Sequence, residues 1–361
     1  MTYISNSFAN GVAMQLFMTS RNASSNQGAV DKIIELVRAS TRQTPSTTDI
    51  YAPFDGAQID TRDGNESDDP HLSIDAFNDA RIFTGGGNDS IGAYRRAVIS
   101  SGSGNDYITT DDKGVVDSGS GDDYVYGNSY MTVNAGEGND EVRTDGYSSV
   151  DAGDGDDVVV TLGYSRVDGG AGNDTLIAVD NTADHSDQAG HAVLNGGEGD
   201  DDIQIGRNSV ANGGTGNDKI TLVRGGSTVE FARGDGQDRV FAADDFALAI
   251  SGYSKNDVSV TKQDGNIIIS FAGSQDTITV NLPDEKAIQL SFNDGTEMTI
   301  NGADESLKPT FNVKWTSPEW TYAEAYKEFE YSTTNADYTL YEERLEINAR
   351  MMSALRVNLA Q

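Results

Sequence analysis

One pattern recurs along this 361-residue chain at a nearly constant spacing. The motif Gly-x-Gly-x-Asp, followed by any residue and then an aliphatic one, occurs nine times. Six of the eight steps between successive motifs equal 17 (102 − 85 for the first), and the other two are 27 and 20. A fixed period of this length is typical of proteins built from stacked structural units. The first glycines of the motifs are Gly85, Gly102, Gly119, Gly136, Gly153, Gly170, Gly197, Gly214 and Gly234.

Two further columns of the aligned repeat are apolar, which predicts two short strands in every unit. Three residues before the first glycine stand Ile82, Ile99, Val116, Val133, Val150, Val167, Leu194, Ala211 and Phe231. Six residues after it stand Ile91, Ile108, Val125, Val142, Val159, Leu176, Ile203, Ile220 and Val240. One unit cannot bury these side chains alone, whereas stacked units bury them between two parallel sheets. We therefore predict an all-β fold, a parallel β-roll (β-solenoid) over residues 80–243 with nine 17-residue coils. At the usual strand spacing such a roll is about 40 Å long.

The composition agrees with a repeat protein that lacks one large apolar core. Hydrophobic residues make up 36% of the chain, and 31 of its 40 glycines lie in residues 80–243. The formal net charge of −33 would repel phosphates, so nucleic acid is not expected as a partner. No stretch approaches the roughly 18 apolar residues of a membrane-spanning helix. The absence of cysteine excludes disulfides and thiolate chemistry, and three histidines are too few for a histidine-rich metal site.

The turn between the two predicted strands carries the residue types that bind calcium. Calcium takes about six to eight oxygen ligands from carboxylates and carbonyls. Glycine can adopt a positive φ and so turn its carbonyl toward a common point, while aspartate adds charged oxygens. Counting the residue before the first glycine as position 1, positions 2 and 4 are glycine and position 6 is aspartate in all nine units. The aspartates are Asp89, Asp106, Asp123, Asp140, Asp157, Asp174, Asp201, Asp218 and Asp238. The position-4 glycines are Gly87, Gly104, Gly121, Gly138, Gly155, Gly172, Gly199, Gly216 and Gly236.

Three units, at residues 169–176, 196–203 and 213–220, read Gly-Gly-x-Gly-x-Asp-x-aliphatic in full. With them the region resembles the RTX (repeats-in-toxin) family of haemolysin-type calcium-binding repeats. The resemblance implies that aspartates of adjacent turns share calcium ions, with carbonyls around the two glycines completing the shell. The other six units depart from the pattern at position 1, where they carry Thr84, Ser101, Ser118, Ala135, Ala152 and Arg233.

A second departure concerns the opposite edge of the coil. RTX rolls usually take two nonapeptides per coil, with a calcium turn on each edge. Here the opposite turns, such as Gly127-Asn128-Ser129 and Asp145-Gly146-Tyr147, lack the glycine and aspartate spacing. We therefore expect a one-sided ladder, in which nine turns leave gaps for about seven or eight Ca²⁺ ions.

The alternative is a metal-free solenoid whose glycines make turns and whose acids form a solvated face. Charge opposes it, because residues 80–243 hold 28 acids and 11 Lys/Arg, a net of −17 (11 − 28). Aspartates stacked at strand spacing repel one another unless cations lie between them. Eight Ca²⁺ ions would supply +16 (8 × 2), which nearly cancels that charge.

The N-terminal flank, residues 1–79, is predicted to cap the first coil. Val30, Ile33, Ile34 and Val37 have the spacing of an amphipathic helix, for which binding a partner is the competing interpretation. Residues 41–79 are polar and acidic and are expected to form a loop. Because the first basic residue is Arg21, we do not expect a cleaved N-terminal export signal.

Residues 244–303 change to an antiparallel-sheet pattern, with hairpin turns at Asp264-Gly265 and Asp294-Gly295. This segment loosely resembles the haemolysin-type calcium-binding related segment that follows RTX repeats. Residues 304–361 have a helical pattern. The resemblance implies type I secretion, read from an uncleaved C-terminal segment of this kind, and a helix packed on the preceding sheet is the compatible alternative.

No motif for catalysis appears: the chain has no HExxH, no GxSxG, no P-loop and no EF-hand loop. We therefore expect no enzyme, although a chain so rich in acids leaves a paired-carboxylate glycosidase as an open alternative. The resemblance to RTX proteins implies a secreted, calcium-binding protein outside or on the surface of a bacterial cell, with a structural or adhesive role. The alternative is an extracellular protein that binds or modifies polysaccharide. A ladder of exposed aromatic residues would favour that alternative, and candidates are Tyr94, Tyr126, Tyr147 and Tyr164.

Overall fold

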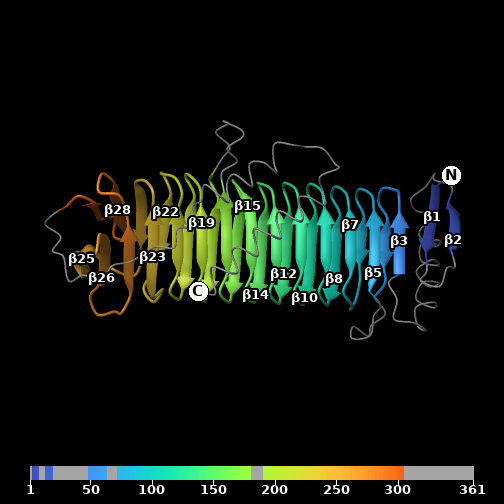
Figure 1. The fold of residues 1–361 in the computed structure, drawn as a ribbon, viewed down its shortest axis with the longest axis horizontal. Coiled ribbons are helices and arrows are strands. Elements are labelled where there is room, and N and C mark those ends of the chain that lie inside the picture. The colour runs from blue at the N-terminus through green and yellow to red at the C-terminus, as the bar shows by residue number, and fades with distance from the viewer. Residues whose placement is uncertain (1, 8–12, 19–47, 63–70, 180–189, 305–361) are drawn as a thin grey trace. The chain divides into compact units, whose positions relative to one another are not determined.

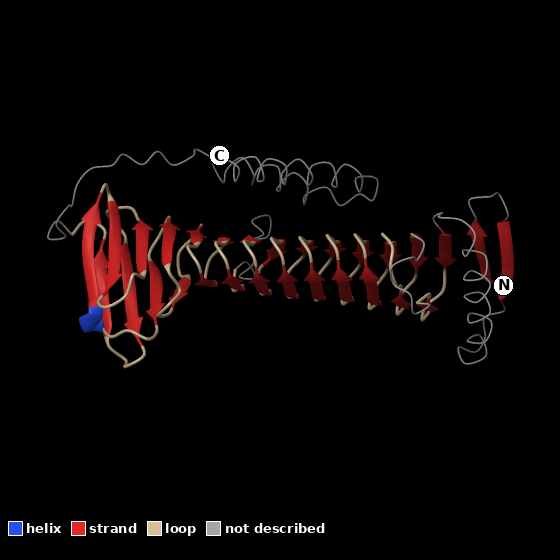
Figure 2. Ribbon diagram, turned by 90° about the horizontal axis from the view of Figure 1, so that it is seen from below, coloured by secondary structure: helices blue, strands red, loops and turns tan. Residues whose placement is uncertain are grey.

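The computed structural model describes residues 2–7, 13–18, 48–62, 71–179 and 190–304. β1 (Thr2–Ser7) and β2 (Ala13–Met18) form a separate antiparallel pair. The remaining strands form two large sheets, here named sheet I and sheet II, which have 13 and 14 strands. Figure 1 shows their strands following one another along the stack, and Figure 2 shows the same strands from a perpendicular direction.

Sheet I contains the nine strands that lead into the Gly-x-Gly-x-Asp turns, together with β4, β24, β28 and β29. In spatial order they are β4 (Gln58–Asp60), β6 (Arg81–Phe83), β8 (Val98–Ser103), β10 (Val115–Ser120), β12 (Thr132–Glu137), β14 (Ser149–Asp154), β16 (Arg166–Ala171), β18 (Val193–Glu198), β20 (Val210–Thr215), β22 (Thr228–Phe231), β24 (Phe246–Ile250), β28 (Ala287–Phe292) and β29 (Glu297–Asn301).

Sheet II contains the strands that follow those turns. In spatial order they are β3 (Thr48–Ala52), β5 (Leu72–Ala76), β7 (Ser90–Ala93), β9 (Tyr107–Thr110), β11 (Tyr124–Gly127), β13 (Glu141–Thr144), β15 (Val158–Leu162), β17 (Thr175–Val179), β19 (Asp202–Ile205), β21 (Lys219–Leu222), β23 (Gln237–Ala242), β27 (Thr277–Asn281), β26 (Asn266–Phe271) and β25 (Val258–Gln263).

Parallel pairing in strict register confirms the predicted β-roll. Val116 of β10 pairs with Val133 of β12, one period later in the chain, and the other coils of the repeat pair in the same way. The register also holds across the longest step between motifs, where Val167 pairs with Leu194. The coils up to Ala211 therefore place the same repeat position above its counterpart in the neighbouring coil. The ninth unit departs from the prediction, because Ala211 pairs with Val229 and not with Phe231.

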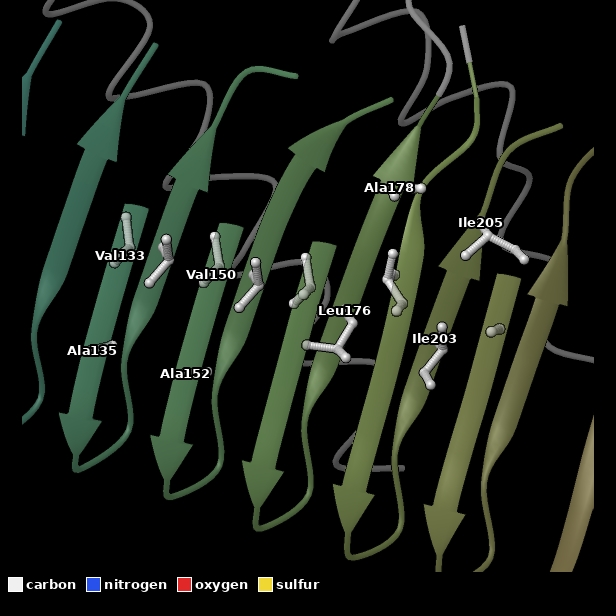
Figure 3. Close-up of a cluster of buried hydrophobic side chains, with 14 of the residues drawn as sticks. Val133, Ala135, Val150, Ala152, Leu176, Ala178, Ile203 and Ile205 are labelled. Atoms are coloured by element: carbon white, nitrogen blue, oxygen red, sulfur yellow. The ribbon is translucent and has the colours of Figure 1, made fainter. Parts of the chain in front are cut away.

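The core lies between the two sheets and contains the two predicted apolar columns together with further buried residues such as Ala178, Ile205 and Leu222. Every residue of those two columns is buried. Figure 3 shows part of this core, with Val133 and Val150 of sheet I and Leu176 and Ile203 of sheet II. Alternate residues of each strand point inward, as the period of two of a β-strand requires.

The stack begins earlier in the chain than the sequence predicts. Residues 41–79 were expected to form a loop, but β3, β4 and β5 lie within them. β4 and β5 pair in parallel with the repeat strands β6 and β7, and β3 pairs in parallel with β5. The prediction is therefore wrong for these three strands. Ile59 and Ile74 are buried at the same places as the repeat aliphatics, although no glycine motif accompanies them. The predicted helix around Val30–Val37 lies outside the described residues.

The C-terminal segment combines parallel and antiparallel pairing. β24, β27 and β28 pair in parallel with earlier strands and so add to the roll, which the antiparallel prediction missed. Both predicted hairpins are confirmed: β25 and β26 flank Asp264-Gly265, and β28 and β29 flank Asp294-Gly295. Asp264 and Gly265 both have positive φ, as a tight hairpin turn requires. A short 3-10 helix, η1 (Lys255–Asp257), precedes β25, and the predicted helical tail lies outside the described residues.

The repeat glycines are required by close stacking as well as by backbone conformation. Gly153 has φ +110°, and a Cβ atom there would overlap the carbonyl oxygen of Gly136 in the preceding coil. From the second unit onward, the glycines at positions 2 and 4 all have positive φ.

We expect Gly153→Ala to disrupt the stack, because both the positive φ and the overlap with Gly136 oppose a side chain. Gly92→Ala is the matched control, because Gly92 lies in a strand and the nearest atoms to a new Cβ are 3.7 Å away. Thermal unfolding followed by circular dichroism should show a large loss of melting temperature for Gly153→Ala only. Equal melting temperatures for the two variants would contradict this.

Candidate metal centre

The nine predicted aspartates lie in one row along one edge of the roll, here called the aspartate edge. Each of the first eight follows a strand of sheet I and directly precedes a strand of sheet II, and Asp238 lies at the start of β23, so the strand register stacks them coil upon coil. All nine are only 1–3% exposed. The structure thus brings together the residues that the sequence predicted, and it places them inside the turn rather than on a solvated surface.

One carboxylate oxygen of each aspartate ties two coils together. The backbone N–H of each of the first eight aspartates donates to Oδ1 of the aspartate one coil later, at 2.7–3.1 Å. At the N-terminal end the backbone N–H of Leu72 donates to Asp89 Oδ1 at 2.8 Å. The row, named the inner ladder, therefore runs without interruption from Asp89 to Asp238.

The second carboxylate oxygen is buried and lacks any hydrogen-bond partner among the described residues at seven of these positions. They are Asp106, Asp123, Asp140, Asp157, Asp174, Asp201 and Asp218. A buried carboxylate oxygen without a partner is costly, and such atoms are rare in folded proteins. These Oδ2 atoms of the inner ladder therefore require a cation or a hydrogen-bond donor as a partner.

A carbonyl oxygen approaches that second carboxylate oxygen. Beside the Cα of Gly196, Oδ2 of Asp201 in the same turn and the carbonyl oxygen of Gly213 in the next coil both lie where a Cβ would stand. The same arrangement recurs at Gly169, with Asp174 and Gly196. Carboxylate and carbonyl oxygens from two coils thus converge, which is the donor set that calcium prefers.

Burial changes the acidity of the row. Desolvation, with a smaller contribution from the neighbouring carboxylates, raises the pKa of Asp123 and Asp174 to about 8. For the same chief reason the pKa of Asp157 rises to about 6. Metal-free, the folded protein therefore holds protons near neutral pH that a cation would replace.

A second row, which the sequence analysis missed, runs beside the first. Position 5, directly before each aspartate, is Asn or Asp in the first eight units, and its Oδ1 accepts the backbone N–H of the same position one coil later. This outer ladder comprises Asn88, Asn105, Asp122, Asn139, Asp156, Asn173, Asp200 and Asn217. It is exposed to solvent, and its hydrogen bonds run in the direction opposite to those of the inner ladder.

The outer ladder differs from the inner one in charge. From Asn105 to Asn217 amide and carboxylate alternate, so no two carboxylates are adjacent. The amide of Asn173 also donates to Asp156 Oδ1 at 3.0 Å. The repeated Asn or Asp before each aspartate was the sequence signal for this ladder.

The C-terminal end of the inner ladder is closed by a carboxylate from outside the repeat. Oδ2 of Asp276 accepts the backbone N–H of Gly234 at 2.8 Å and the hydroxyl of Tyr253. The guanidinium of Arg233 lies over the Tyr253 ring, 4.3 Å from its centroid. The last turn is therefore fixed by side chains of the segment that follows the repeats.

The opposite edge carries a stack of aromatic rings. Tyr130, Tyr147, Tyr164 and His191 follow one another with centroids 4.7–5.0 Å apart and nearly parallel planes. Of the four predicted tyrosines only Tyr147 and Tyr164 belong to this stack. Because the ring faces inside it lie against each other, the stack does not offer them to a sugar.

The described residues contain no group of three or more His, Asp or Glu side chains placed to hold a metal ion. A cation at the inner ladder would therefore need backbone carbonyls in its shell. No protein-family model matches this chain, and no curated protein has a significantly similar sequence. The fold class, a parallel stacked-coil β-solenoid, consequently rests on the structure. In the part of the chain that the structure describes, no helix has the length and apolar character to cross a membrane.

The raised pKa values predict an unusual pH dependence for the metal-free protein. An unfolded aspartate has a pKa of about 3.9, so between about pH 4 and 8 the folded state binds more protons than the unfolded one. Stability in chelator should therefore fall as pH rises from 5 to 8, the range over which Asp157 and Asp123 ionise. Thermal unfolding at several pH values would test this, and a melting temperature that rises across the range would contradict it.

We predict that the alternation in the outer ladder protects it from repulsion. Asn139→Asp keeps the acceptor for the Asp156 N–H but places three carboxylates, at 122, 139 and 156, in succession. The melting temperature should fall by about 2–4 °C, the effect of roughly 1 kcal/mol, and added salt should reduce the loss. Asp122→Asn is the control and should be neutral or stabilising. A salt-independent effect would indicate that charge is not the cause.

Proposed function

We propose that this chain is a secreted, calcium-binding roll protein related to the RTX proteins, without catalytic activity. The observation that carries the proposal is the row of buried carboxylates, seven of which have an oxygen without a partner among the described residues. The inner-ladder aspartates would hold the ions, together with carbonyls such as those of Gly196 and Gly213.

The donor set favours calcium over other biological cations. Every available ligand is an oxygen, and much of the shell must come from backbone carbonyls, which suits a large, hard ion with flexible geometry. Zinc and copper prefer imidazole or thiolate ligands. The repeat units provide neither at the aspartate edge, and the imidazole of His71 lies beside the first unit only, where it accepts the N–H of Asn88. Magnesium demands a nearly ideal octahedron and keeps its water, so it fits a dry, crowded turn less well.

Calcium bound there would supply positive charge between carboxylates that otherwise repel. The repeat region has a net charge of −17 (11 − 28), and its aliphatic core is only one or two side chains per strand. A ligand that binds only the folded chain stabilises it by about 2.7 kcal/mol per site at a hundredfold excess over Kd. Several such sites would make folding depend on calcium.

This dependence suggests a role in export. Where calcium is scarce the repeats would stay unfolded and able to pass a secretion channel, and where it is plentiful they would fold. The proposed location is therefore outside the cell or on its surface, reached by type I secretion. Its proposed role there is structural or adhesive, since the aspartate edge and the core are occupied by groups that hold the fold together.

A calcium titration of the full chain, followed by far-UV circular dichroism, tests the proposal. We expect weak β signal in EDTA at pH 8, a cooperative gain at millimolar calcium, and little gain with the same concentration of magnesium. A strong β signal that persists in EDTA and does not change with calcium would refute the proposal.

Asp157→Asn gives the same experiment a specific readout. The amide keeps the Oδ1 acceptor for the Asp140 N–H but loses the charge that a cation needs. The variant should therefore be more stable than the wild type in EDTA at pH 8 and less stable in calcium. Asp151→Asn, on the exposed face of β14, is the matched control and should shift neither value. Destabilisation of Asp157→Asn to the same extent with and without calcium would indicate a purely structural aspartate.

A further inference from the structure

Position 1 of the turn divides the inner ladder into chemically different parts. In the first three units this residue is Thr84, Ser101 or Ser118, and each is buried. Each hydroxyl donates to the position-1 carbonyl of the next coil, at 2.7, 2.9 and 3.1 Å in that order. These hydroxyls link adjacent coils beside the aspartate row, so these three joints are named the hydroxyl-bridged joints.

In the next five units position 1 carries no hydroxyl. Position 1 is Ala135 and Ala152 in the next two units and Gly169, Gly196 and Gly213 in the three after them. At Gly169 and Gly196 the carbonyl oxygen of the next coil and the aspartate Oδ2 both lie close to where a Cβ would stand, and no hydroxyl lies between them. We name the Gly169–Gly196 and Gly196–Gly213 connections the bare joints.

We infer that Thr84, Ser101 and Ser118 stand in for part of the cation, so that the hydroxyl-bridged joints need less calcium than the bare joints. The inference rests on the proposed function. At a hydroxyl-bridged joint the next coil's carbonyl already has a donor, and one hydrogen bond of this kind shifts an equilibrium constant about two- to tenfold. At a bare joint two oxygens face each other, and a cation is the group that can satisfy both.

The consequence is a graded response along one roll. As the calcium concentration falls, the coils connected by the bare joints separate first, while those connected by the hydroxyl-bridged joints stay paired. Nearest-neighbour contacts dominate the stability of stacked repeats, so the two parts can respond separately. The chain would thus respond over a wider calcium range than a uniform ladder.

Hydrogen exchange of the full chain, read by mass spectrometry across a calcium titration at pH 8, tests this. Residues 98–110 report the hydroxyl-bridged joints, and residues 193–205 report the bare joints. We expect the calcium concentration at half protection to be about two- to tenfold lower for residues 98–110. Equal midpoints, or a lower one for residues 193–205, would overturn the inference but leave calcium-dependent folding intact. Protection that calcium does not change in either segment would instead refute the proposed function.

A triple variant assigns the difference to the hydroxyls. Thr84→Ala with Ser101→Ala and Ser118→Ala keeps a Cβ that position 1 already carries at Ala135 and Ala152, so it should fold in saturating calcium. Its midpoint for residues 98–110 should rise toward that of residues 193–205. The control replaces three outward-facing hydroxyls of strands at these joints, those of Ser100 in β8, Thr109 in β9 and Thr132 in β12, by alanine and should leave both midpoints in place. A triple variant with an unchanged midpoint would overturn the assignment.

Discussion

Parallel stacking in register is the constraint on which the whole structure depends. It places each residue against the residue at the same repeat position in the next coil. Val116 lies on Val133 and Asp157 on Asp174, at the spacing of adjacent strands. An aliphatic residue gains from such a neighbour, since the pair becomes a continuous core. A carboxylate loses, since repulsion between identical charges grows as water is excluded. Identical side chains stacked in one column must therefore either attract one another or be stabilised by another group that lies between them.

The columns meet this requirement in different ways. The aliphatic columns pack between the sheets, and the outer ladder alternates amide and carboxylate. At the opposite edge Tyr130, Tyr147 and Tyr164 all have positive φ, which is unfavourable for a bulky residue, and their stacked rings compensate for part of that cost. Only the inner ladder keeps one uniform charged residue in all nine repeat units, and among the described residues it is there that buried carboxylate oxygens lack partners. The exception among the columns is thus the one that points to a bound cation.

The sequence predicted the parts of the fold that repeat and missed those that do not. The period, both aliphatic columns and the row of aspartates could be read directly, because each recurs at a fixed position. The coil at β5 was missed because Leu72 stands where the later units have aspartate, and only Ile74, one period before Ile91, continues the pattern. The parallel strand β27 was missed because β25 and β26 separate it from β23, so Asp238 pairs with Ile278 at a step much longer than the period. Which carboxylate oxygen is bonded, and how far burial raises each pKa, depends on atomic positions that no period reveals.

Both ladders lie on the aspartate edge, and this limits where a gene for such a chain can gain or lose codons. Ten extra residues between β17 and β18 leave both ladders intact, because β17 ends and β18 begins away from the aspartate edge: Asp174 still bonds to Asp201, and Asp200 to Asn173. The turn before β23 is longer on the aspartate edge, and there the outer ladder ends, with the N–H of Gln237 donating to the carbonyl of Gly216 instead. Insertions that preserve both ladders are therefore tolerated on one edge only. On the other, the chain can grow or shrink by whole coils, through in-frame duplication or deletion of the gene segment that encodes one period.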